Sequence, residues 1–128
     1  MGITRSQMSK KVLIIEDTVD IADALKILVE MQGYEAVVAT DGLEGCDRAR
    51  DERPDLILMD LALPGMDGLE ATRTIRSRPE GAQTPILCVS SYAGGHEEEL
   101  LMAGCNEVLS KSSFIAAFVP TLNKYLNK

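Results

Sequence analysis

Five residues with reactive or ligating side chains follow short apolar runs, each at the point where a buried strand would end. Glu16 and Asp17 follow "VLII", Asp60 ends "LILMD", Ser90 falls in "PILCVSS" and Lys111 ends "NEVLSK". Burying an ionised carboxylate without a partner is costly. Asp60 must therefore lie at the wet end of its strand or have a compensating partner.

Three acids, a hydroxyl and a lysine can together bind a divalent cation and a phosphoryl group. Two carboxylates about 5 Å apart repel by ~3 kcal/mol at an effective dielectric constant of 20, so the acids need positive charge beside them. Lys111 supplies one charge. Mg²⁺, which prefers carboxylate and water oxygens, would supply more, with Mn²⁺ as an alternative. No cluster of His and Cys favours zinc.

A carboxylate can attack phosphorus and form an aspartyl phosphate. That reaction requires charge neutralisation and positioning more than acid–base catalysis. In this hypothesis Asp60 is the nucleophile, and Asp17 and Asp60 hold the metal with Glu16 close by. Lys111 and the Ser90 hydroxyl would each contact a phosphoryl oxygen.

Alternating periodicities predict the elements that bring these residues together. Continuous apolar runs indicate strands, and apolar residues at helical spacing indicate the helices between them. The order of five strand–helix pairs predicts an α/β fold with a parallel sheet covered on both faces. In such doubly wound sheets ligands bind at the carboxyl ends of the strands. The predicted strands cover residues 11–17, 34–39, 55–60, 85–91 and 106–111.

Each predicted helix has an apolar face that would pack on the sheet. Gly33 ends the first helix and Pro54 ends the second. The predicted faces are Ile21, Leu25, Leu28 and Val29 in the first helix, Leu43, Cys46 and Ala49 in the second, and Leu69, Thr72 and Ile75 in the third. The fourth helix falls within 94–105, and the last carries Phe114, Phe118, Leu122 and Tyr125.

Composition limits the class of protein. A chain of 128 residues predicts one domain, over 11–128, after a flexible lead-in at 1–10. Its net charge of -7 disfavours nucleic-acid binding. No run approaches the ~20 apolar residues of a membrane span. Three dispersed cysteines without a secretory signal favour reduced thiols and a cytoplasmic location; they are Cys46, Cys88 and Cys105.

Each residue of the constellation also has an ordinary structural explanation. An Asp after a strand often caps a helix or forms a turn, and Asp67 with Gly68 is a turn signal. Lys111 could be a surface lysine, with Ser112 or Ser113 capping the last helix. These explanations suffice singly, but their coincidence at the ends of four strands favours a functional site.

The chain resembles the response regulator receiver domain over residues 11–127. The resemblance rests on the "IIED" acid pair, "DLILMDLALPGMDG", "PILCVSS" and "NEVLSK", with Ser90 thirty residues after Asp60 and Lys111 twenty-one after Ser90. It implies a flavodoxin-like sheet in the order 2-1-3-4-5. It also implies that Asp60 is the phosphoacceptor, that Asp17 and Glu16 are metal-binding acids, and that the Ala62 carbonyl is the third protein ligand.

The resemblance further implies how the domain works. Its donor would be a histidine kinase or a histidine phosphotransfer protein, and its output a protein target bound at the face of strand four, helix four, strand five and helix five. Ser90 and Lys111 would contact the phosphate and switch that face. Such a domain is not a conventional enzyme, since it turns over only its own phosphoryl group. A monomer or weak dimer is expected, and the acidic "GGHEEELL" favours a basic partner.

Two positions depart from the family pattern. Val108 stands where the fifth strand usually has Tyr or Phe, so no ring can move inward behind Ser90. Ser112 stands where a proline usually follows the lysine. A cis bond before Ser112 would cost ~2.5–4 kcal/mol, so we expect a different local backbone there. Tyr92 is an alternative lever for the switch.

Other functions are consistent with the same fold. A phosphate-independent binding module, or pseudo-receiver, is favoured by Val108 and Ser112 but opposed by the retained acids and Lys111. A flavodoxin is disfavoured because "EDTVDIAD" is acidic where a flavin phosphate would bind. An aspartate-nucleophile phosphatase is disfavoured because its DxD motif usually follows the first strand.

Overall fold

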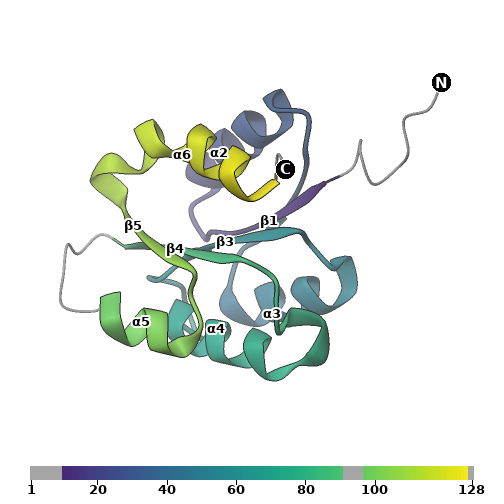
Figure 1. Ribbon diagram of the computed structural model, residues 1–128, viewed down its shortest axis with the longest axis vertical. Helices are drawn as coiled ribbons and strands as arrows, with labels where there is room; N and C mark the ends of the chain where they lie inside the picture. Colours follow the sequence, from purple (N-terminus) through teal and green to yellow (C-terminus); the bar gives the residue numbers. More distant parts are fainter. Residues whose placement is uncertain (1–9, 91–96, 127–128) are drawn as a thin grey trace.

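The centre of the molecule is a five-stranded parallel sheet in the order β2-β1-β3-β4-β5 (Figure 1). The computed structural model describes residues 10–90 and 97–126. The predicted doubly wound α/β fold and its strand order are confirmed. The strands are β1 (Lys11–Ile15), β2 (Glu35–Ala39), β3 (Leu56–Asp60), β4 (Ile86–Ser90) and β5 (Glu107–Ser110).

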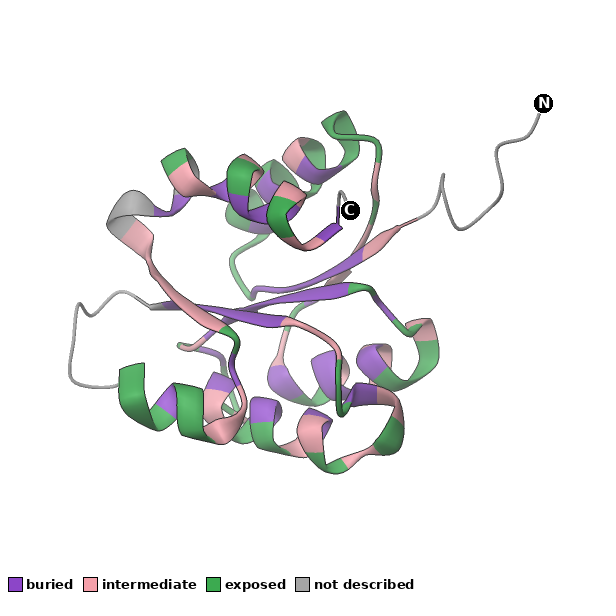
Figure 2. Ribbon diagram, viewed as in Figure 1, coloured by how far each residue is buried: buried purple, intermediate pink, exposed green. Residues whose placement is uncertain are grey.

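Helices cover both faces of the sheet. Figure 1 shows α2 and α6 on one face and α3, α4 and α5 on the other. In Figure 2 the buried positions of these helices lie on the sides that face the sheet. Among the described residues, no helix has both the length and the apolar character needed to cross a bilayer. The helices are α2 (Val19–Met31), α3 (Gly42–Glu52), α4 (Gly68–Ser77), α5 (Glu97–Ala103) and α6 (Lys111–Leu126), with a 3₁₀ turn η1 (Pro79–Gly81) after α4.

The strands are buried because apolar helices cover both of their faces. All five residues of β3 are buried, as are four of the five in β1. Two core clusters result, one on each side of the sheet. The cluster under α2 and α6 contains Leu25, Phe114 and Phe118, and the cluster under α3 to α5 contains Cys46 and Ile75.

An aspartate caps the beginning of each of two helices. The Asp41 carboxylate accepts a hydrogen bond from the Glu44 amide at 2.7 Å and caps α3. The Asp67 carboxylate accepts one from the Glu70 amide at 2.9 Å and caps α4. Asp67 is thus a structural cap rather than a ligand, because its oxygen satisfies an amide that the helix leaves unpaired.

Two predicted core residues are exposed. Ile21 is 40% exposed, because the buried stripe of α2 is formed by Ala22, Leu25 and Val29. Leu43 is 61% exposed. The second case arises because the buried face of α3 is formed by Gly42, Gly45, Cys46 and Ala49.

The glycine face of α3 lies directly on the sheet. A Cβ at Gly45 would be 2.6 Å from Ile15 Cδ1, so the helix approaches β1 through glycine rather than through a large side chain. Leu43 is consequently turned toward solvent.

The boundary between β5 and α6 also differs from the prediction. β5 ends at Ser110 and α6 begins at Lys111, so Lys111 opens the helix instead of ending the strand. Ser112 therefore lies inside the first turn of α6 rather than at the residue before it. The described residues contain no cis peptide bond, in agreement with the expectation for a serine after Lys111.

The prediction of three reduced cysteines is wrong for two of them. Cys88 and Cys105 are joined as a disulfide in this structure, with their Cα atoms 6.4 Å apart, and Cys46 is a buried free thiol. Cys88 lies within β4 and Cys105 shortly before the neighbouring strand β5. Adjacent strands bring residues this far apart in sequence into bonding range, which no local sequence motif indicates.

Candidate functional site

The carboxyl ends of the strands meet at one edge of the sheet, and the predicted functional residues meet there with them. Ile15, which precedes the acid pair, is paired with Met59, which precedes Asp60. On the other side, Ser90 at the end of β4 is paired with Ser110 at the end of β5. Asp60 is paired with Val89, so the four strand ends lie within about one residue of the same level.

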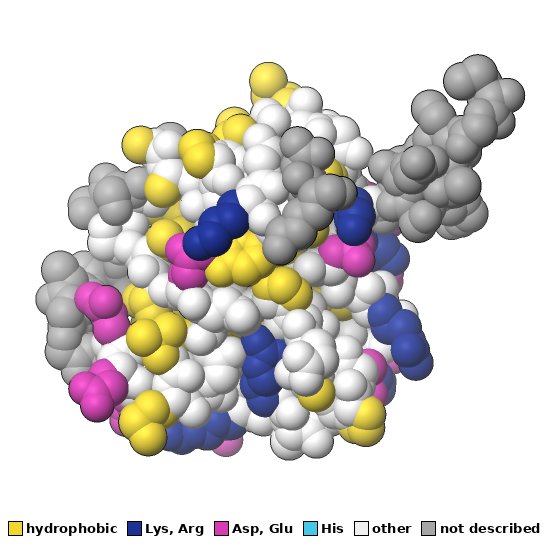
Figure 3. Space-filling model, in the orientation of Figure 1, with side chains coloured by type: hydrophobic (Ala, Val, Ile, Leu, Met, Phe, Trp, Pro, Cys, Tyr) yellow, Lys and Arg dark blue, Asp and Glu magenta, His cyan; other side chains and the backbone are white. Residues whose placement is uncertain are grey.

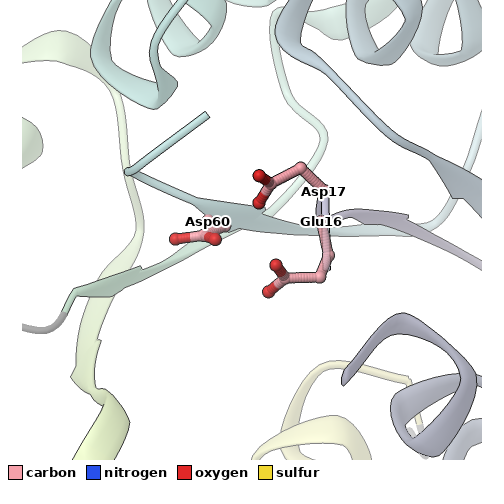
Figure 4. Close-up of side chains that lie close together, drawn as sticks. All are labelled: Glu16, Asp17 and Asp60. Atoms are coloured by element: carbon pink, nitrogen blue, oxygen red, sulfur yellow. The ribbon is translucent and has the colours of Figure 1, made fainter. Parts of the chain in front are cut away.

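The three predicted acids form a compact cluster. Glu16, Asp17 and Asp60 each offer a carboxylate oxygen, and these oxygens all lie within 4.8 Å of one another. Glu16 and Asp60 are 4% and 5% exposed, whereas Asp17 is open to solvent. Figure 4 shows the Asp17 and Glu16 side chains pointing in opposite directions just after β1, with Asp60 beside them on β3. The cluster thus has one outward and two inward carboxylates.

Asp60 has the compensating partners that its burial requires. Lys111 Nζ lies 3.4 Å from Asp60 Oδ1 and 3.5 Å from Oδ2. The Ala62 amide donates a hydrogen bond to Oδ1 at 3.1 Å. One cation and one backbone amide therefore offset the cost of placing this carboxylate at the end of a buried strand.

Glu16 is less well compensated, and its acidity reflects this. Burial raises the pKa of the Glu16 carboxyl to about 7, and the nearby charge of Asp60 raises it as well. A hydrogen bond from the Thr18 amide, 3.1 Å long, and the charge of Lys111 act in the opposite direction. A cation bound beside Glu16 would favour its ionised form.

The donor set of the cluster suits a hard divalent cation. Even at the outer limit of 4.8 Å for these oxygens, two ionised carboxylates repel by about 3 kcal/mol at an effective dielectric constant of 20. Lys111 carries the one positive charge paired with them among the described residues. The ligands on offer are oxygens, with no sulfur or imidazole in the group, and oxygen ligands are those that Mg²⁺ prefers. The exposed Ala62 lies next to this group.

The loop that carries Ala62 is held by glycine contacts that sequence reasoning missed. A Cβ at Gly68 would lie 2.7 Å from the Asp60 carbonyl oxygen, and one at Gly42 would be 3.0 Å from Met66 Cβ. Only glycine permits α3 and α4 to approach the loop this closely. The two Asp-Gly pairs in the sequence indicated helix starts but gave no sign of this contact.

The structure describes two of the predicted switch positions, Val108 and Ser90, but not Tyr92. Val108 is half-buried and packs on the core under α3 to α5. Ser90 ends β4 as predicted, one strand away from Asp60. Ser91 and Tyr92 lie outside the described residues, so the alternative of Tyr92 as a lever stays a prediction.

Comparison with known proteins identifies relatives of the whole chain. The family model for the response regulator receiver domain matches residues 12–122. The polar-differentiation response regulator DivK of Brucella anthropi is 38% identical over 120 residues, which is 93% of this chain and 98% of that protein.

Solved structures agree with that result. The receiver domain of the sensor histidine kinase PA1611 of Pseudomonas aeruginosa, with a magnesium ion in its active-site cleft, aligns with a TM-score of 0.84 and 30% identity. The alignment covers 94% of this chain and 99% of that one. The chemotaxis protein CheY4 of Vibrio cholerae aligns with a TM-score of 0.84 and 27% identity, covering 92% and 99%.

Proposed function

We propose, from the premise that this chain belongs to the response regulator receiver domain family, that Asp60 accepts a phosphoryl group in a Mg²⁺-dependent reaction. One observation carries the proposal: the buried Asp60 carboxylate lies between a lysine and two further carboxylates at the carboxyl edge of the sheet. Asp60 can therefore act as the nucleophile while its neighbours hold the charges that the transfer requires.

The donor would be a phosphohistidine on a kinase or phosphotransfer protein. An Asp60 oxygen attacks phosphorus, an O–P bond forms, and the N–P bond to the imidazole breaks. The histidine nitrogen then takes a proton from water, so the donor is returned as neutral imidazole. Lys111, already 3.4 Å from Asp60 Oδ1, would move its ammonium onto a phosphoryl oxygen. The Ser90 hydroxyl would donate to another.

The metal would be held by Asp17 and Asp60, with the Ala62 carbonyl as third protein ligand and Glu16 behind them. Mg²⁺ bound there supplies Lewis-acid neutralisation of the phosphoryl oxygens. The oxygen-only donor set supports this choice, as does the magnesium-bound receiver domain of Pseudomonas aeruginosa. Mn²⁺ has no comparable support.

The readout would be a protein contact made at the face of β4, α5, β5 and α6, the fourth and fifth strand–helix pairs. On α5, Leu101 is 49% and Met102 83% exposed, and Glu97 to Glu99 lie in its first turn. Apolar side chains beside a run of acids fit a basic protein partner. Figure 3 shows one face of the molecule, on which Lys and Arg side chains lie among acidic and apolar side chains. The net charge of -7 supports a domain that makes no direct nucleic-acid contacts.

The remaining assignments follow the same premise. Residues 11–128 would form the receiver domain and 1–10 a lead-in, of which 1–9 lie outside the described residues. A cytoplasmic location and a monomer or weak dimer fit a diffusible phosphoacceptor. The domain would hydrolyse its own aspartyl phosphate slowly and act on no other substrate.

A pseudo-receiver is the second candidate, and Val108 favours it. The half-buried Val108 has no ring to fill the space behind Ser90 when a phosphoryl group arrives. Moving a two-state switch from 1:99 to 99:1 takes about 5.5 kcal/mol of differential stabilisation. Without an aromatic side chain at position 108 to couple phosphorylation to the partner-binding face, the domain would bind its partner independently of phosphate.

Intact mass after incubation with acetyl phosphate separates the two candidates. We expect one added phosphoryl group in the native chain with Mg²⁺, and none without Mg²⁺ or in Asp60→Asn. Asp67→Asn is the matched control, because Asp67 caps α4 and lies outside the cluster. No added mass in the native chain, together with no binding of beryllofluoride, would favour the pseudo-receiver.

A further inference from the structure

A cavity of about 260 Å³ lies beside the acidic cluster, between the sheet and the helices α2 and α6. An apolar cavity of about 150 Å³ is enough to bind benzene. This cavity therefore has room for one ring with a short substituent. Its walls are mainly apolar, with Ile14, Leu58 and Val89 from the sheet, Ile21 and Leu25 from α2, and Phe114 from α6.

The exposure of Ile21 is explained by this cavity. Ile21 lines the cavity and is 40% exposed, whereas Leu25, one turn further along α2, is buried. The first turn of α2 therefore stands at the opening, and the second turn closes the interior. A ligand that entered here would cover Ile21 and contact Leu25.

Only part of the acidic cluster lines the cavity. Glu16, Asp60 and Lys111 line it, but Asp17 does not. Figure 4 shows the Glu16 side chain on the side of the sheet where the purple α2 and yellow α6 lie, with Asp17 turned to the opposite side. The cavity thus adjoins the proposed metal site and shares Glu16 and Asp60 with it, while its interior extends away from Asp17.

The balance of charge selects the kind of ligand. Lys111 is paired with Asp60 at 3.4 Å. Among the described residues no Lys or Arg lies within ion-pairing distance of Glu16, which accepts a hydrogen bond from the Thr18 amide and lies against the Asp60 carboxyl group. When ionised, Asp60 and Lys111 offset each other, so the lining keeps one net negative charge. That charge is on the buried Glu16 carboxylate, beside the apolar part of the cavity.

We propose that this cavity binds a small hydrophobic organic cation, an aryl or alkyl chain bearing a primary ammonium. The hydrocarbon would occupy the space between Leu25, Val89 and Phe114, and the ammonium would pair with Glu16. This assignment stands on the cavity alone and holds whether or not Asp60 accepts phosphate. Because the cavity and the proposed metal site share Glu16, such a cation and a divalent metal ion weaken each other's binding.

The test uses three probes that share one ring: benzylammonium, the neutral benzyl alcohol and the anionic benzoate. Each is titrated into the full-length, ¹⁵N-labelled, metal-free protein at a pH above 7, and saturable shifts of backbone amides are followed. We expect shifts around Leu25 and Val89, with benzylammonium about tenfold tighter than benzyl alcohol and benzoate weakest. Equal affinities for the three probes would overturn the cation assignment, and no saturable shift from any probe would overturn the cavity site.

Two sets of variants sharpen the result. Glu16→Gln should bind benzylammonium no more tightly than benzyl alcohol, while its affinity for benzyl alcohol stays native, which also shows that the variant is folded. Ile21→Phe should fill the opening and weaken both probes. Ile27→Phe makes the same change at a 57% exposed position of α2 outside the cavity lining and should leave both unchanged. Native benzylammonium binding in Ile21→Phe or Glu16→Gln would refute the proposal.

Discussion

Lys111 Nζ lies 3.4 Å from one carboxylate oxygen of Asp60 and 3.5 Å from the other, although 51 residues separate the two in sequence. The contact exists because β3 and β5 end at the same edge of the sheet, with only β4 between them. It has two opposite consequences. The ammonium stabilises the buried carboxylate, and it also repels any cation that binds there.

Lys111→Gln should therefore bind Mg²⁺ more tightly while taking up phosphate more slowly. The Lys111 side chain is 35% exposed, so water screens part of this repulsion, and the value in water is its lower limit. Two unit charges 4 Å apart interact by about 1 kcal/mol in water, and a divalent ion doubles this. We expect Mg²⁺ affinity to rise roughly thirtyfold, since about 2 kcal/mol is lost at 1.36 kcal/mol per factor of ten, and calorimetric titration measures it.

Lys124→Gln is the charge-matched control for that experiment. Lys124 is 63% exposed and pairs with Glu107 at 2.6 Å, away from the acidic cluster. The variant loses the same charge and should keep native Mg²⁺ affinity. If Lys111→Gln bound Mg²⁺ no more tightly than Lys124→Gln, the Lys111 ammonium would not repel the metal ion.

The raised pKa of Glu16 should make the metal-free protein less stable as pH rises. Its pKa is about 7 in the folded protein against an ordinary value of 4.5. Between these values the folded protein holds a proton that the unfolded chain has released, so stability falls as pH rises from about 4.5 to about 7 and then levels off. The loss is at most about 3 kcal/mol at 1.36 kcal/mol per unit. Urea unfolding followed by circular dichroism, in the presence of a chelator, measures it.

Glu16→Gln removes the group that titrates and should flatten this pH dependence. The variant should also be more stable than the native chain at pH values above 7. Asp17→Asn is the comparison, because Asp17 is exposed in the same cluster and should leave the slope in place. A native slope in Glu16→Gln would assign the effect to another group.

Much of the fold was predictable because parallel strands carry a strong signal. Apolar runs such as that ending at Asp60 are buried on both sides, and the order of strands and helices restricts the topology. The orientation of each helix was less predictable. Leu43 is exposed because Gly45 brings α3 against Ile15, and a glycine contributes nothing to an apolar stripe.

The site was predictable as a set of strand ends, but its energetics were not. Residue types and spacing were enough to bring Asp17, Asp60 and Lys111 together, because carboxyl ends of parallel strands share an edge. The burial of Glu16 depends on the direction in which its side chain leaves β1. The Cys88–Cys105 bond likewise depends on a contact between neighbouring strands.

Arg76 joins three segments and should be important for stability. From α4 its guanidinium donates to the carbonyl oxygens of Gly81 at 2.6 Å and Gly104 at 3.0 Å, and to Asn106 Oδ1 at 2.8 Å. The same Asn106 oxygen accepts from the Ile86 amide at the start of β4. Arg76→Ala leaves several of these acceptors without their donor. We expect a loss of about 2–3 kcal/mol in the free energy of unfolding.

Arg73→Ala provides the control on the same helix. Arg73 is exposed, and its truncation should change stability by less than about 0.5 kcal/mol. Arg76→Lys should lie between native and Arg76→Ala, since an ammonium cannot reproduce the planar fork. Equal stability of the two alanine variants in urea would show that Arg76 does not bind the segments together.

Gly42 should matter for the metal site although it is no ligand. A Cβ at this position would clash with the Met66 carbonyl oxygen and lie 3.0 Å from Met66 Cβ, so either α3 or the loop after β3 must move. That loop carries Ala62, whose amide donates to Asp60 at 3.1 Å. Gly42→Ala should therefore weaken Mg²⁺ binding and cost about 1–3 kcal/mol of stability, as overpacking usually does.

Calorimetric Mg²⁺ titration and urea unfolding of Gly42→Ala test this link, with Leu43→Ala as the neighbouring control. Leu43 is 61% exposed and one residue further along α3, so its truncation should leave both measurements close to native. Weaker Mg²⁺ binding in Gly42→Ala at a temperature where the variant is fully folded would show that the position of the loop governs the metal site. Lower stability with native Mg²⁺ affinity would mean that α3 moves and the loop does not.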